Sequence, residues 1–213
     1  PHRYQTAFKE IGYDISLSQA ERAYHLANKY FMRFRQGALS QKSDSVISDF
    51  HRCVCQYLDT ESVWKDFSNQ LKKMERPVWR CFDFTLNMLD ELNDMGIKTG
   101  LISNWDLSCR AVLEKNKILS RLNCVVVSEE VGAEKPDKKI FEEALKLTGA
   151  NPDECFYVGD NYYDDYIGSQ KVSMPCAIIN YQGKLGIKEV DCPIVIEQAC
   201  EVVDLMKKHL ISK

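Results

Sequence analysis

From Pro77 to the C-terminus, helical and strand-like patterns alternate, and this alternation constrains the fold more than any other feature. The expected strands are Ile97–Ile102, Cys124–Val127, Phe156–Val158, Cys176–Ile179 and a short one at Ile194–Ile196, and the expected helices include 78–94, 107–117 and 137–147. Short apolar strands separated by helices predict an α/β fold, with a parallel sheet core covered by helices on both faces. Ligands of such sheets bind at the carboxyl ends of the strands, so the loops after the strands are where we expect a site.

The first part of the chain shows only helical spacing of its apolar residues. Ser18 with Glu21 is typical of a capping box before a long helix, and Asp44 is expected to begin another helix. Several helices joined by short connections predict an all-α helical bundle. We therefore expect a helical domain at 1–75 and an α/β domain at 76–213.

Composition excludes some partners. The formal net charge is -3, so no basic surface favours nucleic acid. No stretch approaches the roughly 20 apolar residues that cross a bilayer, so no membrane partner is expected. The nine cysteines are scattered and several lie in apolar runs, where free cysteine acts as a small hydrophobe. This usage favours a reducing cytoplasmic location. Nothing in the sequence indicates the oligomeric state.

Polar residues follow the first two strands of the α/β part. Ser103 and Asn104 offer a hydroxyl and an amide where a helix is about to begin, which suits an anion, although this segment alone favours simple capping of the helix by Ser103 or Asp106. Lys135 follows the second strand and precedes Pro136, which favours an extended backbone at the lysine. A lysine held there can neutralise a phosphate, although surface lysines before prolines are common.

An acidic cluster follows the third strand. Asp160 comes directly after Gly159, and Asp164 and Asp165 lie a few residues further along. Three carboxylates so close together repel one another unless a cation lies among them. Mg²⁺ binds to one or two carboxylates together with water and phosphate oxygens, so this segment indicates a magnesium site, although turn and helix-cap formation accounts for the acidic residues equally well.

Taken together, these segments resemble the haloacid dehalogenase-like superfamily of hydrolases. GLISNWD is similar to the family's second motif, SEEVGAEKPDKKIFEEAL to its third and FYVGDNYYDDYIGS to its fourth. The resemblance covers 77–210, and residues 4–75 look like the family's helical cap. It implies a Rossmann-like core with an all-α cap.

The resemblance also implies a function and a role for each matching residue. Members like this chain are Mg²⁺-dependent phosphatases that form an aspartyl-phosphate, here on a small phosphorylated metabolite. Ser103 and Asn104 would hold the phosphate, and Lys135 would bind it and balance its charge during catalysis. Asp160 would bind Mg²⁺ directly. Asp165 would be the second acid at the metal, where it orients metal-bound water or Lys135; Asp164 is the less favoured candidate.

The family's first motif, an apolar strand followed by DxDx[TV] with the nucleophile, is absent from this sequence. In the family that strand is central in the sheet, so we expect it to end a few residues before Pro1. Cys81–Leu86 mimics the motif with cysteine in the nucleophile's place, but its helical spacing, with Pro77 in the first turn, favours a helix. Ser169 and Ser173 stand where the family often has alanine and glycine.

Two other functions fit the same residues. One is dehalogenation of a 2-haloacid, which uses the same aspartate without a metal. The other is an inactive family member that binds a phosphate compound or a protein partner. The sequence does not identify the substrate.

Overall fold

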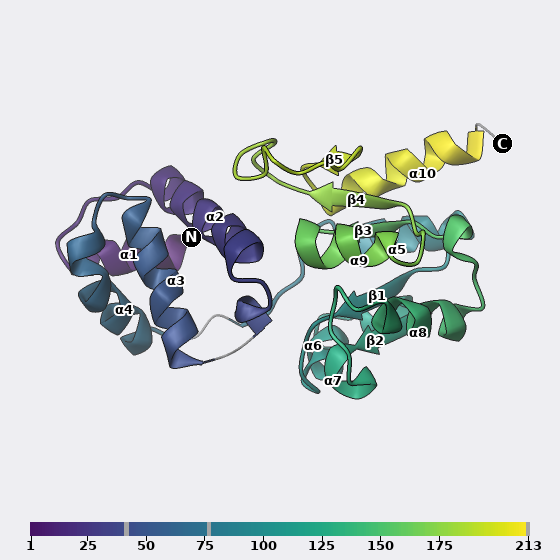
Figure 1. Cartoon of the computed structure of the whole chain (residues 1–213), viewed down its shortest axis with the longest axis horizontal. Helices are drawn as coiled ribbons and strands as arrows, with labels where there is room; N and C mark the ends of the chain where they lie inside the picture. Colours follow the sequence, from purple (N-terminus) through teal and green to yellow (C-terminus); the bar gives the residue numbers. More distant parts are fainter. Residues whose placement is uncertain (41–42, 76–77, 212–213) are drawn as a thin grey trace. The chain divides into compact units, whose positions relative to one another are not determined.

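The computed structural model describes residues 1–40, 43–75 and 78–211, and the chain divides into two compact units (Figure 1). The helical unit comprises Pro1–Val78 together with Leu185–Lys188. The α/β unit comprises Trp79–Lys184 and Glu189–Lys213. Within the described residues, no helix combines the length and the apolarity that crossing a membrane requires.

The helical unit consists of α1 (His2–Glu10), α2 (Leu17–Phe34), η1 (Ala38–Ser40), α3 (Asp44–Gln56), η2 (Glu61–Val63) and α4 (Trp64–Lys73). Its core is built from aromatic and small apolar side chains that lie on the inner faces of these helices. The largest that are 8% exposed or less are Phe8, Phe31, Phe50, Val54, Phe67 and Leu71. Burial of this apolar surface stabilises the bundle.

The start of α2 differs from the sequence expectation. The capping box is formed by Ser16 and Gln19, not by Ser18 and Glu21. Ser16 Oγ accepts from the Gln19 backbone N–H at 3.2 Å, and Gln19 Oε1 accepts from the Ser16 N–H at 2.9 Å. The helix begins two residues earlier than expected, because the same Ser-x-x-polar pattern occurs in both registers and the chain uses the first.

The α/β unit alternates helices with strands in the expected order. Its elements are α5 (Thr85–Asp94), β1 (Gly100–Ser103), α6 (Cys109–Lys115), η3 (Leu119–Arg121), β2 (Cys124–Val127), α7 (Ser128–Val131), α8 (Lys138–Thr148), η4 (Pro152–Glu154), β3 (Tyr157–Gly159), η5 (Tyr162–Tyr166), α9 (Ile167–Gln170), β4 (Cys176–Ile179), β5 (Val195–Ile196), η6 (Ala199–Glu201) and α10 (Val202–Ile211). All strand pairs are parallel. The predicted α/β class is confirmed.

Strand β2 shows why the strands are apolar without interruption. Val125 and Val127 face one side and pack in the same cluster as α6. Val126 faces the other side and packs with α8. Because successive side chains of a strand point to opposite faces, a strand covered on both faces must be apolar at every position.

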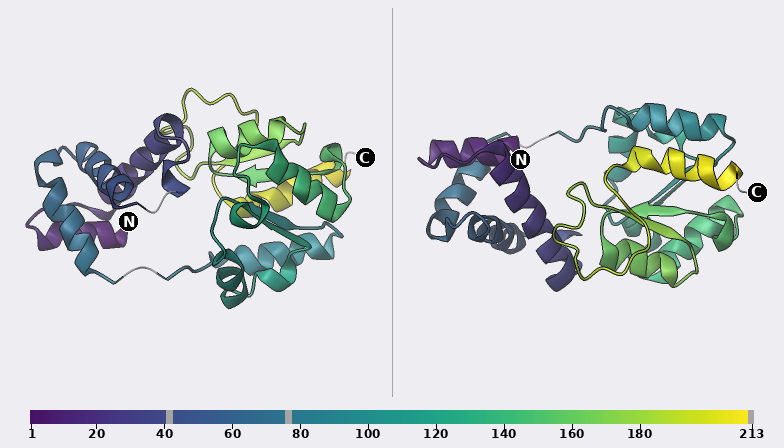
Figure 2. Two further views of the ribbon diagram at one scale, coloured as in Figure 1. Left: turned by 60° about the horizontal axis from the view of Figure 1, so that its bottom comes forward. Right: turned by 90° about the horizontal axis from the view of Figure 1, so that it is seen from above.

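The described strands form two sheets, in the orders β1-β2 and β3-β4-β5. Each of β1 and β3 is paired along one edge only, and no backbone hydrogen bond joins them within the described residues. On the outside of the unit, α10 runs beside α5, where Lys207 Nζ lies 2.6 Å from Glu91 Oε1 (Figure 2). Within the described residues, β1 and β3 therefore each have an open edge.

The helix expected at 78–94 begins only at Thr85, so that expectation was wrong for its first turns. A side chain from α6's C-terminal end holds the preceding segment: Asn116 Oδ1 accepts from the Cys81 N–H at 3.0 Å, and Asn116 Nδ2 donates to Trp79 O at 3.2 Å. These hydrogen bonds replace the helical ones. The described part of Cys81–Leu86 contains no strand, and Pro77 lies outside the described residues.

Candidate active site

Three loops at the carboxyl ends of the strands carry the candidate residues. Ser103 ends β1 and Asn104 follows it, Lys135 lies between β2 and α8, and Asp160 follows β3 directly. Ser103 is paired in register with Val127, so β1 and β2 end at the same level. The loops after β1 and β2 therefore begin at the same edge of their sheet, and the side-chain contacts between Lys135 and Asp165 bring the loop after β3 to them.

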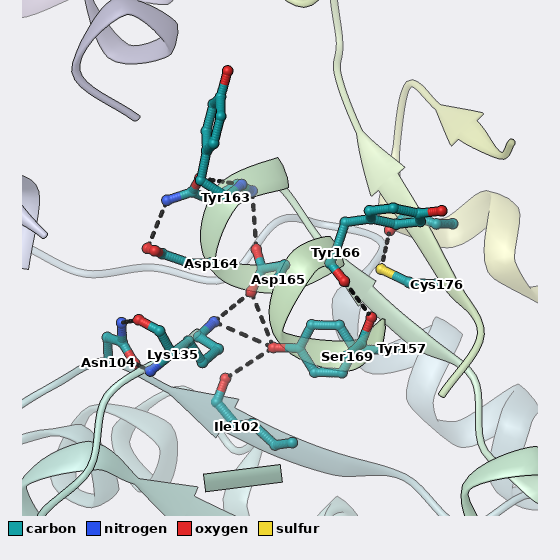
Figure 3. A network of polar contacts seen from close by, with 12 residues as sticks. Ile102, Asn104, Lys135, Tyr157, Tyr163, Asp164, Asp165, Tyr166, Ser169 and Cys176 are labelled. Atoms are coloured by element: carbon teal, nitrogen blue, oxygen red, sulfur yellow. Dashed lines mark hydrogen bonds and ion pairs between the residues drawn. The ribbon is translucent and has the colours of Figure 1, made fainter. Parts of the chain in front are cut away.

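Lys135 and Asp165 form a buried ion pair. Lys135 Nζ lies 2.6 Å from Asp165 Oδ1, and the two side chains are 13% and 3% exposed (Figure 3). Asp165 Oδ2 accepts a second hydrogen bond, from the backbone N–H of Asn161 at 2.9 Å. A pair removed from water is kept charged only when its hydrogen bonds compensate for the lost hydration, and both carboxylate oxygens are bonded here.

Tyr157, the first residue of β3, contacts both members of this pair. Its hydroxyl accepts from Lys135 Nζ at 3.2 Å and lies 3.2 Å from Asp165 Oδ1 and 3.3 Å from Ile102 O, to either of which it can donate. Burial, and next the charge of Asp165, raise the pKa of Tyr157 well above its ordinary value, so the phenol stays protonated. The sequence analysis missed Tyr157; the available signal was a polar-tipped ring inside a buried strand.

The side-chain amide of Asn104 forms two hydrogen bonds with the backbone of Lys135. Its Oδ1 accepts from the Lys135 N–H at 2.7 Å, and its Nδ2 donates to Lys135 O at 3.0 Å (Figure 3). The amide predicted to hold phosphate is thus committed to the lysine backbone. Ser103 is half-buried, and its hydroxyl has no hydrogen-bond partner among the described residues. The Ser103 hydroxyl is therefore available to a ligand.

The acidic cluster carries more negative charge than Lys135 offsets. The pKa of Asp164 is raised to about 6, first by burial and then by Asp165, while Asp160 and Glu134 raise it further and Lys135 lowers it. Asn161 Nδ2 donates to Asp164 Oδ2 at 2.6 Å and holds that carboxylate beside the pair. An excess of carboxylates gathered around one ammonium favours the binding of a further cation.

The oxygen-rich character of this cluster fits Mg²⁺. Asp160 is exposed at the tip of β3, whereas Asp165 is committed to the hydrogen bonds described above. Within the described residues, no three His, Cys, Asp or Glu side chains form a group that could hold a metal on their own. Carboxylate oxygens are ligands of the kind that Mg²⁺ prefers, and Mg²⁺ completes its shell with water and phosphate oxygens.

The sequence matches a known family of hydrolases. The model of the family described as haloacid dehalogenase-like hydrolase matches residues 2–179. The human haloacid dehalogenase-like hydrolase domain-containing protein 3 is 29% identical over 184 residues, covering 80% of this chain and 71% of that protein. The glyceraldehyde 3-phosphate phosphatase of Methanothermobacter thermautotrophicus is 34% identical over 107 residues, covering 47% of this chain and 45% of that protein.

Solved structures show the same fold. A HAD phosphatase from Thermococcus onnurineus superposes with a TM-score of 0.57 at 20% identity, covering 96% of this chain and 91% of that chain. The HAD-hydrolase YfnB from Bacillus subtilis, solved bound to magnesium, gives a TM-score of 0.60 at 14% identity, covering 98% of this chain and 89% of that chain. At these identities the similarity concerns the fold alone.

Proposed function

Because the chain belongs to the haloacid dehalogenase-like hydrolases, we propose that it is a Mg²⁺-dependent phosphatase of a small phosphorylated metabolite. The observation that carries this proposal is the buried Lys135–Asp165 pair beside an excess of carboxylates. Phosphoryl transfer proceeds through a transition state with charge spread over three equatorial oxygens, and fixed positive charge around those oxygens stabilises it.

Each residue of the site has a part in this proposal. Ser103 Oγ donates a hydrogen bond to one phosphate oxygen, and Lys135 Nζ offsets the charge of the phosphoryl group. Asp165 keeps the lysine in place through the 2.6 Å contact, and Asn104 fixes its backbone. Mg²⁺ held by Asp160, with Asp165 as the second acid near it, would supply the remaining positive charge.

We place the nucleophilic aspartate on a further strand between β1 and β3, outside the residues of this sequence. The support is the pair of open strand edges, because a strand inserted there would pair with both. Neighbouring strands of a sheet lie about 4.8 Å apart, so a strand paired with both edges would replace the contact that the Tyr157 hydroxyl makes here with Ile102 O. The aspartate would attack phosphorus while the P–O bond to the alcohol breaks, and the second aspartate of the DxDx[TV] motif would give the departing alcohol its proton. Water, deprotonated by that second aspartate, would then hydrolyse the aspartyl-phosphate and release inorganic phosphate.

Hydrolysis of an aryl phosphate by a protein extended upstream to include an aspartate-bearing strand tests the proposal. We expect turnover that requires Mg²⁺ and that disappears in Lys135→Ala and in Asp160→Asn. Full activity in both variants would refute the site. Lys138→Ala is the matched control, since Lys138 forms an exposed pair with Glu142 on α8 and should leave the rate unchanged.

The same assay separates the alternatives. Turnover of a 2-haloacid that persists in EDTA would favour the dehalogenase. Binding of orthophosphate and Mg²⁺ by calorimetry without turnover in the extended protein would favour an inactive binding member. The phosphatase is preferred because the acidic cluster needs a cation, which dehalogenation does not require.

A further inference from the structure

Ser128, the residue directly after β2, binds the backbone of the loop that follows β1. Its hydroxyl accepts from the Trp105 N–H at 3.1 Å and donates to Trp105 O at 3.1 Å. Ser128 is 5% exposed and is the first residue of α7, whose start has no side-chain cap. The hydroxyl therefore does not serve its own helix, as serines near helix starts often do, but holds a different loop.

The loop after β1 holds the connection after β2 in return. Asn104, the residue before Trp105, binds the backbone of Lys135 through its side-chain amide (Figure 3). Ser128 and Lys135 both lie on the connection between β2 and α8. Four side chain–backbone hydrogen bonds, two in each direction, therefore join the two loops beyond the ends of β1 and β2.

These hydrogen bonds do not cross the open edges of β1 and β3. They join the loops after β1 and β2, and these two strands are paired with each other. The strand that we place between β1 and β3 would pair with the opposite edge of β1. The link between the two loops is therefore compatible with the complete sheet.

We propose that Ser128 is a positioning residue for phosphate binding at Lys135. Its hydroxyl fixes the Trp105 backbone and so keeps Asn104 in place, and Asn104 in turn fixes the backbone of the lysine. The inference rests on the proposed function, because it assumes that phosphate binds at Lys135. Without the hydroxyl, the two loops would have to be ordered when phosphate binds, and that ordering would reduce the affinity.

Ser128→Ala tests the proposal on the full chain, with Ser169→Ala as the matched control. Ser169 is also fully buried, and its hydroxyl also donates to a backbone carbonyl, Tyr166 O at 2.9 Å, but it joins neither of the two loops. One measured quantity is the affinity for inorganic phosphate in the presence of Mg²⁺, by titration calorimetry. The other is the rate of amide hydrogen exchange at Trp105 and Lys135, by NMR, with the amides of β2 as the reference for general loosening.

We expect both amides to exchange slowly in the wild type and in Ser169→Ala. In Ser128→Ala their exchange should accelerate more than that of the β2 amides, and phosphate should bind about tenfold more weakly, the size of one lost hydrogen bond. Unchanged phosphate affinity in Ser128→Ala, or unchanged exchange at Lys135, would overturn the proposal. Rapid exchange of both amides in the wild type would also overturn it, and this readout needs no variant to fold.

A double-mutant cycle with Asn104→Ala tests the route by which Ser128 acts. Because the effect passes through Asn104, the double variant should bind phosphate as weakly as Asn104→Ala alone, within about twofold. A general loss of stability would not produce this coupling. Losses that multiply in the double variant would mean that Ser128 does not act through Asn104, and they would overturn the proposal.

The proposed function and the role of Ser128 fail in different ways. If the wild type binds no phosphate while Ser128→Ala accelerates exchange at Lys135, the proposed function is refuted, and only the structural link between the loops stands. If the wild type binds phosphate and Ser128→Ala binds it equally well, the proposed function survives and the role of Ser128 is refuted.

Discussion

Both units bury polar side chains, but they treat them differently. In the helical unit, His51 Nδ1 pairs with Ser68 Oγ at 2.9 Å, and the rings of Tyr4 and Phe67 lie edge-on around the imidazole. Burial, followed by the charges of Arg3 and Lys72, lowers the pKa of His51 to about 4, so it is neutral near pH 7. In the α/β unit, by contrast, Lys135 and Asp165 are buried as a charged pair.

This difference in charge distinguishes the His51–Ser68 contact, which is structural, from the Lys135–Asp165 pair, which belongs to a candidate site. A neutral pair inside an aromatic core satisfies its own hydrogen bonds and leaves nothing for a ligand. The network around Lys135 converges from three loops and leaves a lysine N–H and the Ser103 hydroxyl unused among the described residues. Buried charge with spare hydrogen-bonding capacity is what the chemistry of phosphoryl groups needs.

Lys135→Ala should give the largest effect. It leaves the Asp165 carboxylate buried without its cation, so we expect phosphate binding to be lost and the free energy of unfolding to fall by about 4 kcal/mol. Urea unfolding and calorimetry measure both. Lys138→Ala, which breaks an exposed pair with side chains 62% and 49% exposed, should cost less than about 0.5 kcal/mol. Equal losses in the two variants would contradict the distinction between the pairs.

Phe67→Ala should destabilise the helical unit without weakening phosphate binding. The ring is fully buried and stacks on Phe8 with centroids 4.1 Å apart, so its loss should cost about 3 kcal/mol through lost burial and a cavity. Because the ring lies in the helical unit, the affinity for inorganic phosphate should stay within about twofold of the wild type. A tenfold loss of affinity in the folded variant would mean that the helical core serves the site directly.

The pH dependence of stability should follow the histidines of the helical unit. The folded pKa of His51 is about 4, below the unfolded value near 6.5, so the unfolded chain binds the proton more tightly. The stabilising effect of the neutral ring is complete above pH 6.5 and is lost as pH falls towards 4, which amounts to about 2 kcal/mol between pH 7 and pH 5.

His51→Gln removes this titration while its amide can still reach Ser68. Urea unfolding from pH 7 to pH 5 should therefore show a flatter slope in the variant than in the wild type. Some slope should persist, because burial also lowers the pKa of His25. An unchanged slope would show that His51 is not held neutral.

Ser173→Gly should give the smallest effect, and it should be stabilising. Ser173 has φ +58°, in the left-handed region that favours glycine. We expect a gain of about 1 kcal/mol in the free energy of unfolding, measured by thermal melts, with no change in phosphate affinity. A loss of stability would mean that the Ser173 side chain contributes more than the backbone strain costs.

Sequence patterns predicted those elements whose bounds depend on the burial of neighbouring residues in the chain. The bounds of β2 and β4 coincide with the apolar runs Cys124–Val127 and Cys176–Ile179, since a strand buried on both faces is apolar throughout. The loops after the strands could be identified for the same reason. In a parallel sheet the carboxyl ends of the strands point the same way, so the loops that follow the strands are expected on the same side.

What the sequence did not predict depends on contacts between distant residues. The start of α5 is set by the hydrogen bond between Asn116 and the Cys81 backbone, and these residues are 35 positions apart. The spacing of apolar residues within the segment does not predict such a contact. Likewise, the amide of Asn104 binds the backbone of Lys135, 31 residues away, and Tyr157 reaches across to Ile102, 55 residues away. Side-chain contacts at such separations follow from the assembled sheet and not from the local pattern.

The most direct test of the central claim is a crystal structure of the chain with Mg²⁺ and inorganic phosphate. We predict phosphate within hydrogen-bond distance of both Ser103 Oγ and Lys135 Nζ, with Mg²⁺ bound to Asp160 and to a phosphate oxygen. Crystals that show phosphate elsewhere, or that leave these three side chains in separate surroundings, would contradict the assignment of the site.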